Sequence, residues 1–310
     1  MRSKNIMKMG WIVAIFVIAI VSGFIYYTHR SSEKSIIKIA TTTSLYITGL
    51  LDYLSTEFSK KYSNVELVFI AVGTGQALKL AAKGDVCGVI VHDPNLEKLY
   101  IDKGVLEYRK IFAYNFFIIV GPRDDPANVS KAKSIEEAFK RIYNSKLSMK
   151  ILFVSRGDSS GTHIRELIIW RKAGLNPNNE SWYLSCGCSM GQALLIANEK
   201  KAYTLSDIAT FMIYKKAGRI PNLDILYHNT SDYYTINIYS GYISKNCRDE
   251  ERNYVINFLD FIYENQSLIE TYSLDKNNLP IFYPIAEREE EIKKLWEVLS
   301  ESYQDVVKNG

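Results

Sequence analysis

The sequence predicts an α/β protein in which parallel-type sheets are flanked by helices. Short apolar runs rich in β-branched residues, typical of buried strands, recur along the 310 residues. Several of these runs end in a polar turn that opens a segment with apolar residues at helical spacing. Repeated strand–turn–helix units place parallel strands side by side with helices on both faces. A chain of this length is enough for one large domain or for two lobes.

The predicted elements follow one another through most of the chain. The first strand, 36–40, is apolar and β-branched, and the helix after it, 49–58, has leucines at helical spacing. Further strands are predicted at 65–72, 86–91, 112–120, 151–154, 202–204 and 235–244. Further helices are predicted at 77–83, 133–144, 163–173, 190–199, 207–216, 252–263 and 287–307. The last helix is charged and amphipathic, which is typical of a helix that covers a surface.

The N-terminal segment, 1–30, predicts a membrane anchor. Residues 10–27 carry no charge and would make about 27 Å of helix, close to the thickness of a bilayer core. Arg2, Lys4 and Lys8 precede this run, and positive flanks stay on the cytoplasmic side. We therefore expect an uncleaved signal-anchor with the rest of the chain outside. A cleaved signal peptide is the alternative.

The charge distribution gives no sign of a nucleic-acid partner. The net charge of +4 comes from the first 30 residues, and the remainder holds 34 basic and 34 acidic side chains. Nucleic-acid binding usually needs a basic face, so we expect none.

Four cysteines permit disulfides outside the cytoplasm, in three possible pairings. Cys186 and Cys188 are separated by one residue, too close for us to expect a bridge between them without strain. We expect buried thiols or one bridge to Cys87 or Cys247. A metal site is not expected, because the spacing is not that of a CxxC motif.

Three polar turns share one design: 41–44, 73–76 and 156–162 each follow a predicted strand and open a helix. Ligands of α/β sheets bind beyond the carboxyl ends of strands, and helix N-termini offer free N–H groups to anions. The turns contain no lysine, and Arg156 offers a planar fork for two oxygens. We therefore predict a site for a small oxyanion. Its predicted ligands are Thr43, Ser44, Thr74, Gly75, Arg156, Ser159, Ser160 and Thr162.

Each turn also has an ordinary interpretation. Taken singly, 41–44 is a helix N-cap, and 73–76 is a glycine turn that lacks the lysine of a P-loop. Arg156 has Asp158 and Glu166 as possible surface partners. The combination of three such turns at strand ends favours the anion site.

A serine hydrolase is the alternative of a different class, using Ser160 or Ser155 with His163. The spacing does not fit the G-x-S-x-G nucleophile elbow, so we expect no catalysis. His92 and His163 are too few for a metal site, and we interpret both as hydrogen-bonded structural histidines. We expect neither a metal nor a cofactor.

Further motifs occur in a fixed order along the chain. They are ATTTS at 40–44, GLLD at 49–52, AVGTGQAL at 71–78, VHDP at 91–94, YNF at 114–116, VGP at 120–122, FVSRGDSSGTH at 153–163, MG at 190–191 and AYTLSD at 202–207. In order and spacing, this set resembles the tungstate-binding receptors of tungstate ABC transporters, the TupA type. One departure is the CGCS sequence at 186–189, which replaces a more usual Gly/Gln-rich turn.

The resemblance implies a two-lobed, type II periplasmic-binding-protein fold that closes on its anion. Lobe one would comprise 36–118 plus 236–285, and lobe two 119–235, followed by a helical tail at 286–310. The implied ligand is tungstate. Molybdate is the first alternative, and phosphate or sulfate is a less favoured one. The implied protein is an extracytoplasmic monomer without enzymatic activity, and the membrane anchor predicted at 1–30 is a departure from the simplest secreted forms of this type. Its implied partners are an ABC permease and the ATPase of that importer.

Overall fold

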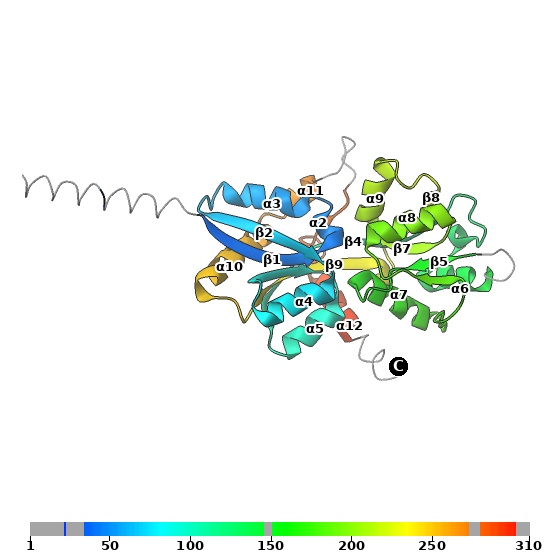
Figure 1. Cartoon of the computed structure of the whole chain (residues 1–310), viewed down its shortest axis with the longest axis horizontal. Coiled ribbons are helices and arrows are strands. Elements are labelled where there is room, and N and C mark those ends of the chain that lie inside the picture. The colour runs from blue at the N-terminus through cyan, green and yellow to red at the C-terminus, as the bar shows by residue number, and fades with distance from the viewer. Residues whose placement is uncertain (1–21, 23–33, 146–150, 273–279, 302–310) are drawn as a thin grey trace, which may run out of the picture.

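Helices and strands fill most of the chain that the computed structural model describes, residues 22, 34–145, 151–272 and 280–301. They gather in two groups, one around β1 and β2 and the other around β5 and β7, with β4 and β9 running between them (Figure 1). The strands are β1 (Ser35–Thr42), β2 (Val65–Val72), β3 (Gly88–Val91), β4 (Leu106–Pro122), β5 (Phe153–Ser155), β6 (Tyr183–Ser185), β7 (Thr204–Asp207), β8 (Leu223–Tyr227), β9 (Ile236–Ser244) and β10 (Tyr283–Pro284). The helices are α2 (Thr43–Tyr46), α3 (Leu50–Ser59), α4 (Thr74–Lys83), α5 (Pro94–Asp102), α6 (Ile135–Ser145), α7 (Gly161–Lys172), α8 (Met190–Lys200), α9 (Ile208–Lys216), α10 (Asp249–Glu264), α11 (Ser267–Thr271) and α12 (Glu289–Glu301), with short 3₁₀ turns η1 (Val129–Lys131) and η2 (Tyr233–Thr235).

The main sheet is mixed, so the prediction of parallel-type sheets holds only in part. Its order is β10-β4-β9-β3-β1-β2, and β7 and β8 pair with the far end of β4. β1 is parallel to both β2 and β3, as repeated strand–helix units predict. β9 is antiparallel to β3 and β4. β4 runs from the first group of elements to the second, and β9 runs from the second group back to the first, so the two strands point in opposite directions.

The strand β4 joins the two groups of elements. Its first part pairs with β9 between Leu106 and Phe116, and its last part pairs with β7 and β8 between Phe117 and Pro122. Because this one continuous strand pairs with β9 in the first group and with β7 and β8 in the second, it sets the positions of these strands relative to one another.

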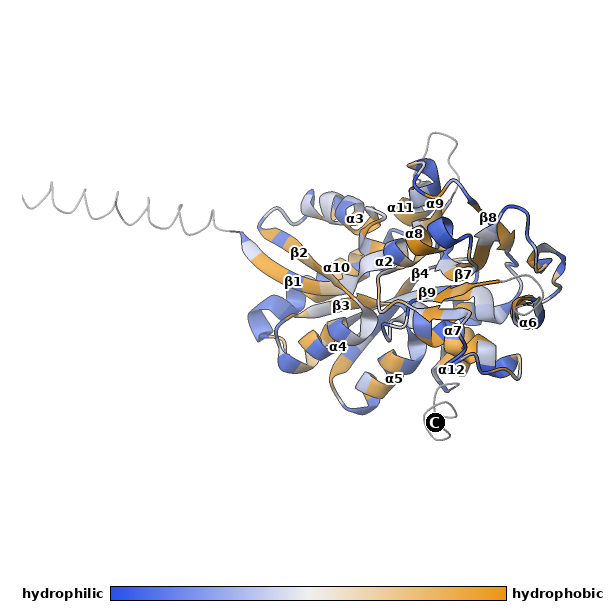
Figure 2. Ribbon diagram, turned by 45° about the vertical axis from the view of Figure 1, so that its right-hand side comes forward, coloured by the Kyte–Doolittle hydropathy of each residue, from blue (hydrophilic) through white to orange (hydrophobic). Residues whose placement is uncertain are grey.

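Apolar strand residues pack against helices on both faces of the sheet. Figure 2 shows hydrophobic residues concentrated in the strands and alternating with hydrophilic ones along the helices. In β1, Ile37 and Ile39 lie in one core with Leu54 of α3, whereas Ala40 lies in another core with Leu78 of α4. Successive residues of a strand point to opposite faces, so one apolar strand holds both layers of helices.

The helix α12 covers a separate core, as the amphipathic pattern predicts. Ile292, Leu295, Trp296 and Leu299 are buried with residues of β4 and β9. The remainder of the predicted helix 287–307, from residue 302 onward, lies outside the described residues.

Two disulfides are present, and one of them contradicts the prediction. Cys87 bonds to Cys247, and Cys186 bonds to Cys188. The expectation that Cys186 and Cys188 lie too close to bridge each other is wrong. Gly187 has φ +61°, a left-handed conformation that favours glycine. The resulting turn leaves the two Cα atoms 5.2 Å apart, which is within the ordinary range for a disulfide.

The predicted anchor at 10–27 lies, apart from Ser22, outside the described residues. Among the residues that are described, no helix has both the length and the apolar character needed to cross a bilayer.

Candidate functional site

The three predicted turns lie where strands run into helices. β1 continues directly into α2, β2 reaches α4 through Gly73, and β5 reaches α7 through 156–160. Within the described structure, the side chain of Thr42 makes no capping hydrogen bond at the start of α2. The N-cap interpretation therefore fails for 41–44. It holds for Ser160, whose Oγ accepts a hydrogen bond from the backbone N–H of His163.

The turns from the two groups of elements meet. A Cβ atom built on Gly161 would lie 3.0 Å from Cε1 of His92, which follows β3. One built on Gly75 would lie 3.8 Å from the carbonyl oxygen of Ser159. The hydroxyl of Ser44 lies 3.5 Å from Nε2 of the same His92. The starts of α2, α4 and α7 thus converge on one region between the groups.

This region contains buried hydroxyl groups whose hydrogen bonding is incomplete. Thr42 and Thr74 are 3% and 0% exposed. In the part of the chain that the structure describes, their Oγ1 atoms have no hydrogen-bond partner. A buried polar group without a partner costs about 1–3 kcal/mol and is uncommon in native proteins. Such hydroxyls, gathered at converging strand ends, are suited to donate to a bound acceptor.

Arg156 supplies the positive charge of the site, and its side chain is only 4% exposed. Its Nε donates to the carbonyl oxygen of Cys188 at 3.3 Å, and one terminal nitrogen lies 3.5 Å from Oγ1 of Thr162. The other terminal nitrogen pairs with Oδ2 of Asp158 at 2.5 Å. Burial lowers the pKa of Arg156, while Asp158 opposes that shift. Arginine nevertheless keeps its proton in proteins, so the site carries a fixed cation.

His92 is neutral at physiological pH. Burial, and then the nearby charge of Arg156, lower its pKa from 6.5 to about 4. Its Nδ1 lies 2.8 Å from Oδ1 of Asn237, and the Asn237 amide donates to Asn115 and Tyr239. Nδ1 therefore carries the ring proton, which leaves Nε2 as the acceptor that faces Ser44.

Comparison with known proteins agrees with this geometry. Residues 28–266 match the model of the PBP superfamily domain. The tungstate-binding protein TupA of Peptoclostridium acidaminophilum is 36% identical over 83% of this chain and 88% of that protein. The chain belongs to the TupA-type family of the PBP superfamily.

Two solved structures are similar to this TupA-type chain. The tungstate ABC transporter structure from Geobacter sulfurreducens has a TM-score of 0.69 and 38% identity, covering 78% of this chain and all of the other. The tungstate-binding protein TupA from Desulfovibrio alaskensis has a TM-score of 0.68 and 34% identity, covering 80% and 98%. These similarities confirm the predicted periplasmic-binding-protein type of fold.

The eight predicted ligands of this TupA-type chain differ in burial. Three of them are partly or fully exposed: Thr43 opens α2 and is half-buried, Gly75 is half-buried in α4, and Ser159 is exposed. The backbone N–H of Ser159 donates to Nδ1 of His163. The buried members are Ser44, Thr74, Arg156, Ser160 and Thr162.

The hydrolase alternative finds no support in this geometry. The hydroxyl of Ser160 accepts from the backbone of His163, and the imidazole Nδ1 of His163 accepts from the backbone of Ser159. A nucleophilic serine must donate its proton to the imidazole, and in the described structure no serine hydroxyl hydrogen-bonds a ring nitrogen of His163. Ser155 is completely buried at the end of β5.

Sequence reasoning missed two features of the candidate site, the orphaned hydroxyl of Thr42 and the carbonyl oxygen of Cys188. The prediction of His92 as a hydrogen-bonded structural histidine is confirmed by its contact with Asn237, but its position beside Ser44 was not predicted. The threonine run 41–43 was a usable signal for Thr42. The role of Cys188 depends on a backbone oxygen, which carries no sequence signal.

Proposed function

We propose that this protein captures tungstate on the extracytoplasmic side of the membrane for an ABC importer. The observation that carries the proposal is the convergence of unpaired, buried hydroxyls and one buried arginine at the starts of three helices. The names of its relatives point to the same ligand. Tungstate at neutral pH is a tetrahedral dianion that only accepts hydrogen bonds. A site built from O–H and N–H donors suits it.

We propose that the predicted ligands on the two lobes, 36–118 plus 236–285 and 119–235, contact the anion together. Closure of the lobes would bring these donors around four oxygens. Removing water strengthens each hydrogen bond in the site. The anion would be released in the same chemical form in which it was bound, and we propose no enzymatic activity.

Delivery requires a membrane permease and its ATPase, and we propose both as partners of a monomeric receptor. Residues 1–30 would hold the receptor at the membrane surface.

Molybdate is the alternative ligand, because it has nearly the size and charge of tungstate. Protonated phosphate fits less well. Such an anion needs an acceptor for its proton, and Asp158 is the only carboxylate in the three turns. Both oxygens of Asp158 already accept hydrogen bonds, one from Arg156 and one from the backbone N–H of Ser160.

The test is isothermal titration calorimetry of the full chain with tungstate, molybdate, phosphate and sulfate. Arg156→Ala is expected to weaken tungstate binding by at least about 100-fold, since two charge-assisted hydrogen bonds are worth about 3 kcal/mol or more. Arg171→Ala is the matched control, because Arg171 is exposed at the end of α7. Equal affinity of the Arg156 variant and the wild type would refute the proposed site.

A further inference from the structure

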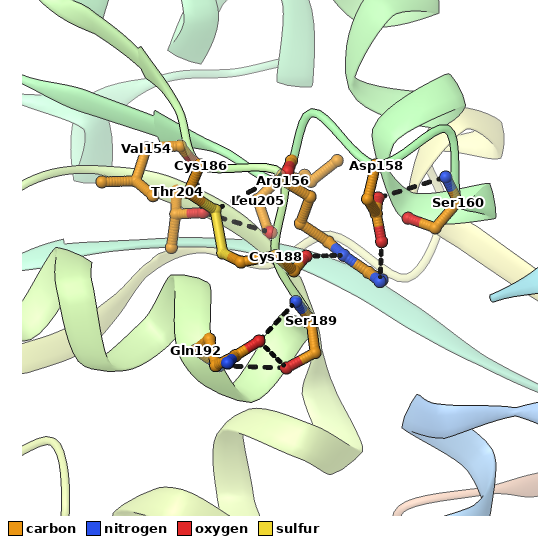
Figure 3. Close-up of a disulfide and its surroundings, with 10 residues drawn as sticks. All are labelled: Val154, Arg156, Asp158, Ser160, Cys186, Cys188, Ser189, Gln192, Thr204 and Leu205. Atoms are coloured by element: carbon orange, nitrogen blue, oxygen red, sulfur yellow. Dashed lines mark hydrogen bonds and ion pairs between the residues drawn. A yellow bond between two sulfur atoms is a disulfide. The ribbon is translucent and has the colours of Figure 1, made fainter. Parts of the chain in front are cut away.

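The Cys186–Cys188 disulfide lies beside the proposed anion site, between β6 and α8. Figure 3 shows it with Arg156 and Asp158 on one side and the N-terminus of α8 on the other. The proposed function assigns this disulfide no role.

The backbone around the disulfide holds Arg156 at two points. The N–H of Cys188 donates to the carbonyl oxygen of Arg156 at 3.0 Å. The carbonyl oxygen of Cys188 accepts from Nε of the same arginine at 3.3 Å (Figure 3). One residue therefore fixes both the backbone and the guanidinium of Arg156. A guanidinium held through Nε still presents its terminal nitrogens to other acceptors, and one of them pairs with Asp158.

The regular structure that supports this turn ends just before it. β5 and β6 share three residue pairs, the last of which joins Ser155 to Ser185. Beyond that pair, the N–H of Cys186 donates to the carbonyl oxygen of Ser155 at 3.1 Å. The chain then reverses at Gly187 in the left-handed conformation. The disulfide closes this reversal covalently, at the point where strand pairing no longer constrains it.

The opposing segment approaches the turn closely. Gly157 also has a positive φ of +61°, and a Cβ atom there would lie 1.9 Å from Oγ of Ser185. Cys186 and Cys188 pack against the core that contains Val154 and Met190. The disulfide is thus fixed to the core on one side and contacts the backbone of Arg156 on the other.

We propose that the Cys186–Cys188 disulfide is a positioning element that aims the guanidinium of Arg156 at the bound oxyanion. This proposal rests on the proposed function. With the disulfide closed, the carbonyl of Cys188 stays against Nε. A dithiol reductant would open it: the S–S bond breaks, each sulfur gains one electron and one proton, and the reductant becomes a disulfide. The released turn would no longer hold Nε, so the guanidinium would keep only its pairing with Asp158 and its contact with Thr162. Oxyanion affinity would then fall.

The test compares two double variants of the full chain by calorimetry with sodium tungstate. Cys186→Ser with Cys188→Ser is expected to raise the Kd at least about 10-fold. Cys87→Ser with Cys247→Ser is the matched control, because that disulfide belongs to the core away from Arg156, and it is expected to keep the wild-type Kd. In an Arg156→Ala background, removing the Cys186–Cys188 disulfide is expected to change the Kd no further, because the two changes act through one group.

Dithiothreitol added to the Cys87→Ser, Cys247→Ser variant, in which Cys186–Cys188 is the remaining disulfide, is the second measurement, in case the first double variant folds poorly. It is expected to weaken tungstate binding reversibly, and reoxidation is expected to restore it. An unchanged Kd, either in the folded double variant or after complete reduction, overturns the proposal.

A readout without anion separates this proposal from the proposed function. The NMR signal of the Arg156 Nε–H, assigned through its loss in Arg156→Lys, is expected to be protected from exchange in the wild type and unprotected in the Cys186→Ser, Cys188→Ser variant. If the wild type binds none of the four oxyanions, the proposed function fails while this signal still decides the positioning role. Equal protection in both proteins refutes that role.

Discussion

Replacing Thr74 with valine is expected to stabilise the ligand-free protein and to weaken its binding of tungstate. The hydroxyl of Thr74 is fully buried and, in the described structure, has no hydrogen-bond partner. An unsatisfied buried group costs about 1–3 kcal/mol. Valine keeps the β-branched shape and removes the group, so the free energy of unfolding should rise by part of that amount. A hydrogen bond to a charged acceptor is worth about 1.5–3 kcal/mol, so the Kd for tungstate should rise about 10- to 150-fold.

The assays are scanning calorimetry of anion-free protein and titration calorimetry with tungstate. Thr235→Val is the matched control, because Thr235 is equally buried but its hydroxyl lies 2.6 Å from the carbonyl oxygen of Asn229. That variant should lose about 1 kcal/mol or more of stability and keep the wild-type Kd. The reasoning is refuted if Thr74→Val destabilises the protein as Thr235→Val does, or if it binds tungstate with unchanged affinity.

Three further predictions concern stability. Removing the Cys87–Cys247 disulfide, which spans 160 residues, should lower the free energy of unfolding by up to about 5 kcal/mol in the chain-entropy model; an unchanged melting temperature would contradict this. Because the pKa of His92 falls from 6.5 to about 4, the folded state binds fewer protons than the unfolded state. Stability should therefore drop by up to about 3 kcal/mol as the pH falls from 6.5 to 4, and His92→Asn should flatten this part of the pH profile of the melting temperature. Burial raises the pKa of Glu166 from 4.5 to about 7. The contribution of Glu166 to the free energy of unfolding therefore has the opposite pH dependence, and it declines as the pH rises from 4.5 to 7. Glu166→Gln should remove that decline. A melting-temperature profile of the variant that runs parallel to that of the wild type would contradict the assignment.

The strand–turn–helix units were predictable because local periodicity encodes them. The helix predicted at 49–58 is α3, and the strand predicted at 65–72 is β2 with the same bounds. Buried strands and amphipathic helices carry their pattern in consecutive residues. The sequence therefore indicates these elements without knowledge of their neighbours.

The extension of β4 was not predictable in this way. The predicted strand began at 112, whereas β4 begins at Leu106. The added residues include Glu107, Arg109 and Lys110, whose charges suggest a loop. Each pairs with a residue far along the chain: Arg252, Glu297 and Asp260, respectively. Partners more than a hundred residues away supply a stability that a local pattern does not reveal.

The candidate site divides along the same line. Side chains at strand ends, such as Arg156 and Thr74, could be named because strand polarity alone places each of them beyond the carboxyl end of its own strand. The neutral state of His92 depends on burial and on the nearby charge of Arg156, and its tautomer depends on Asn237, which comes from β9. The Cys186–Cys188 bridge depends on one left-handed glycine. These features arise from tertiary contacts and backbone conformation, so residue type and spacing did not indicate them.

The charges around Arg156 favour reversible capture. Its guanidinium pairs with Asp158, and Asp207 and Glu166 also interact with it electrostatically. A dianion in the proposed site would therefore meet a cation that is already partly compensated. Affinity must then come from neutral N–H and O–H donors as well as from Arg156, and neutral donors lose their ligand at a smaller electrostatic cost than a cluster of cations would. A receptor that hands its anion to a permease needs this balance, because each transport cycle ends in release. The unpaired hydroxyls of Thr42 and Thr74 fit this requirement: in the proposed site they would gain a partner when the anion binds, and the buried arginine would orient the anion without holding it alone.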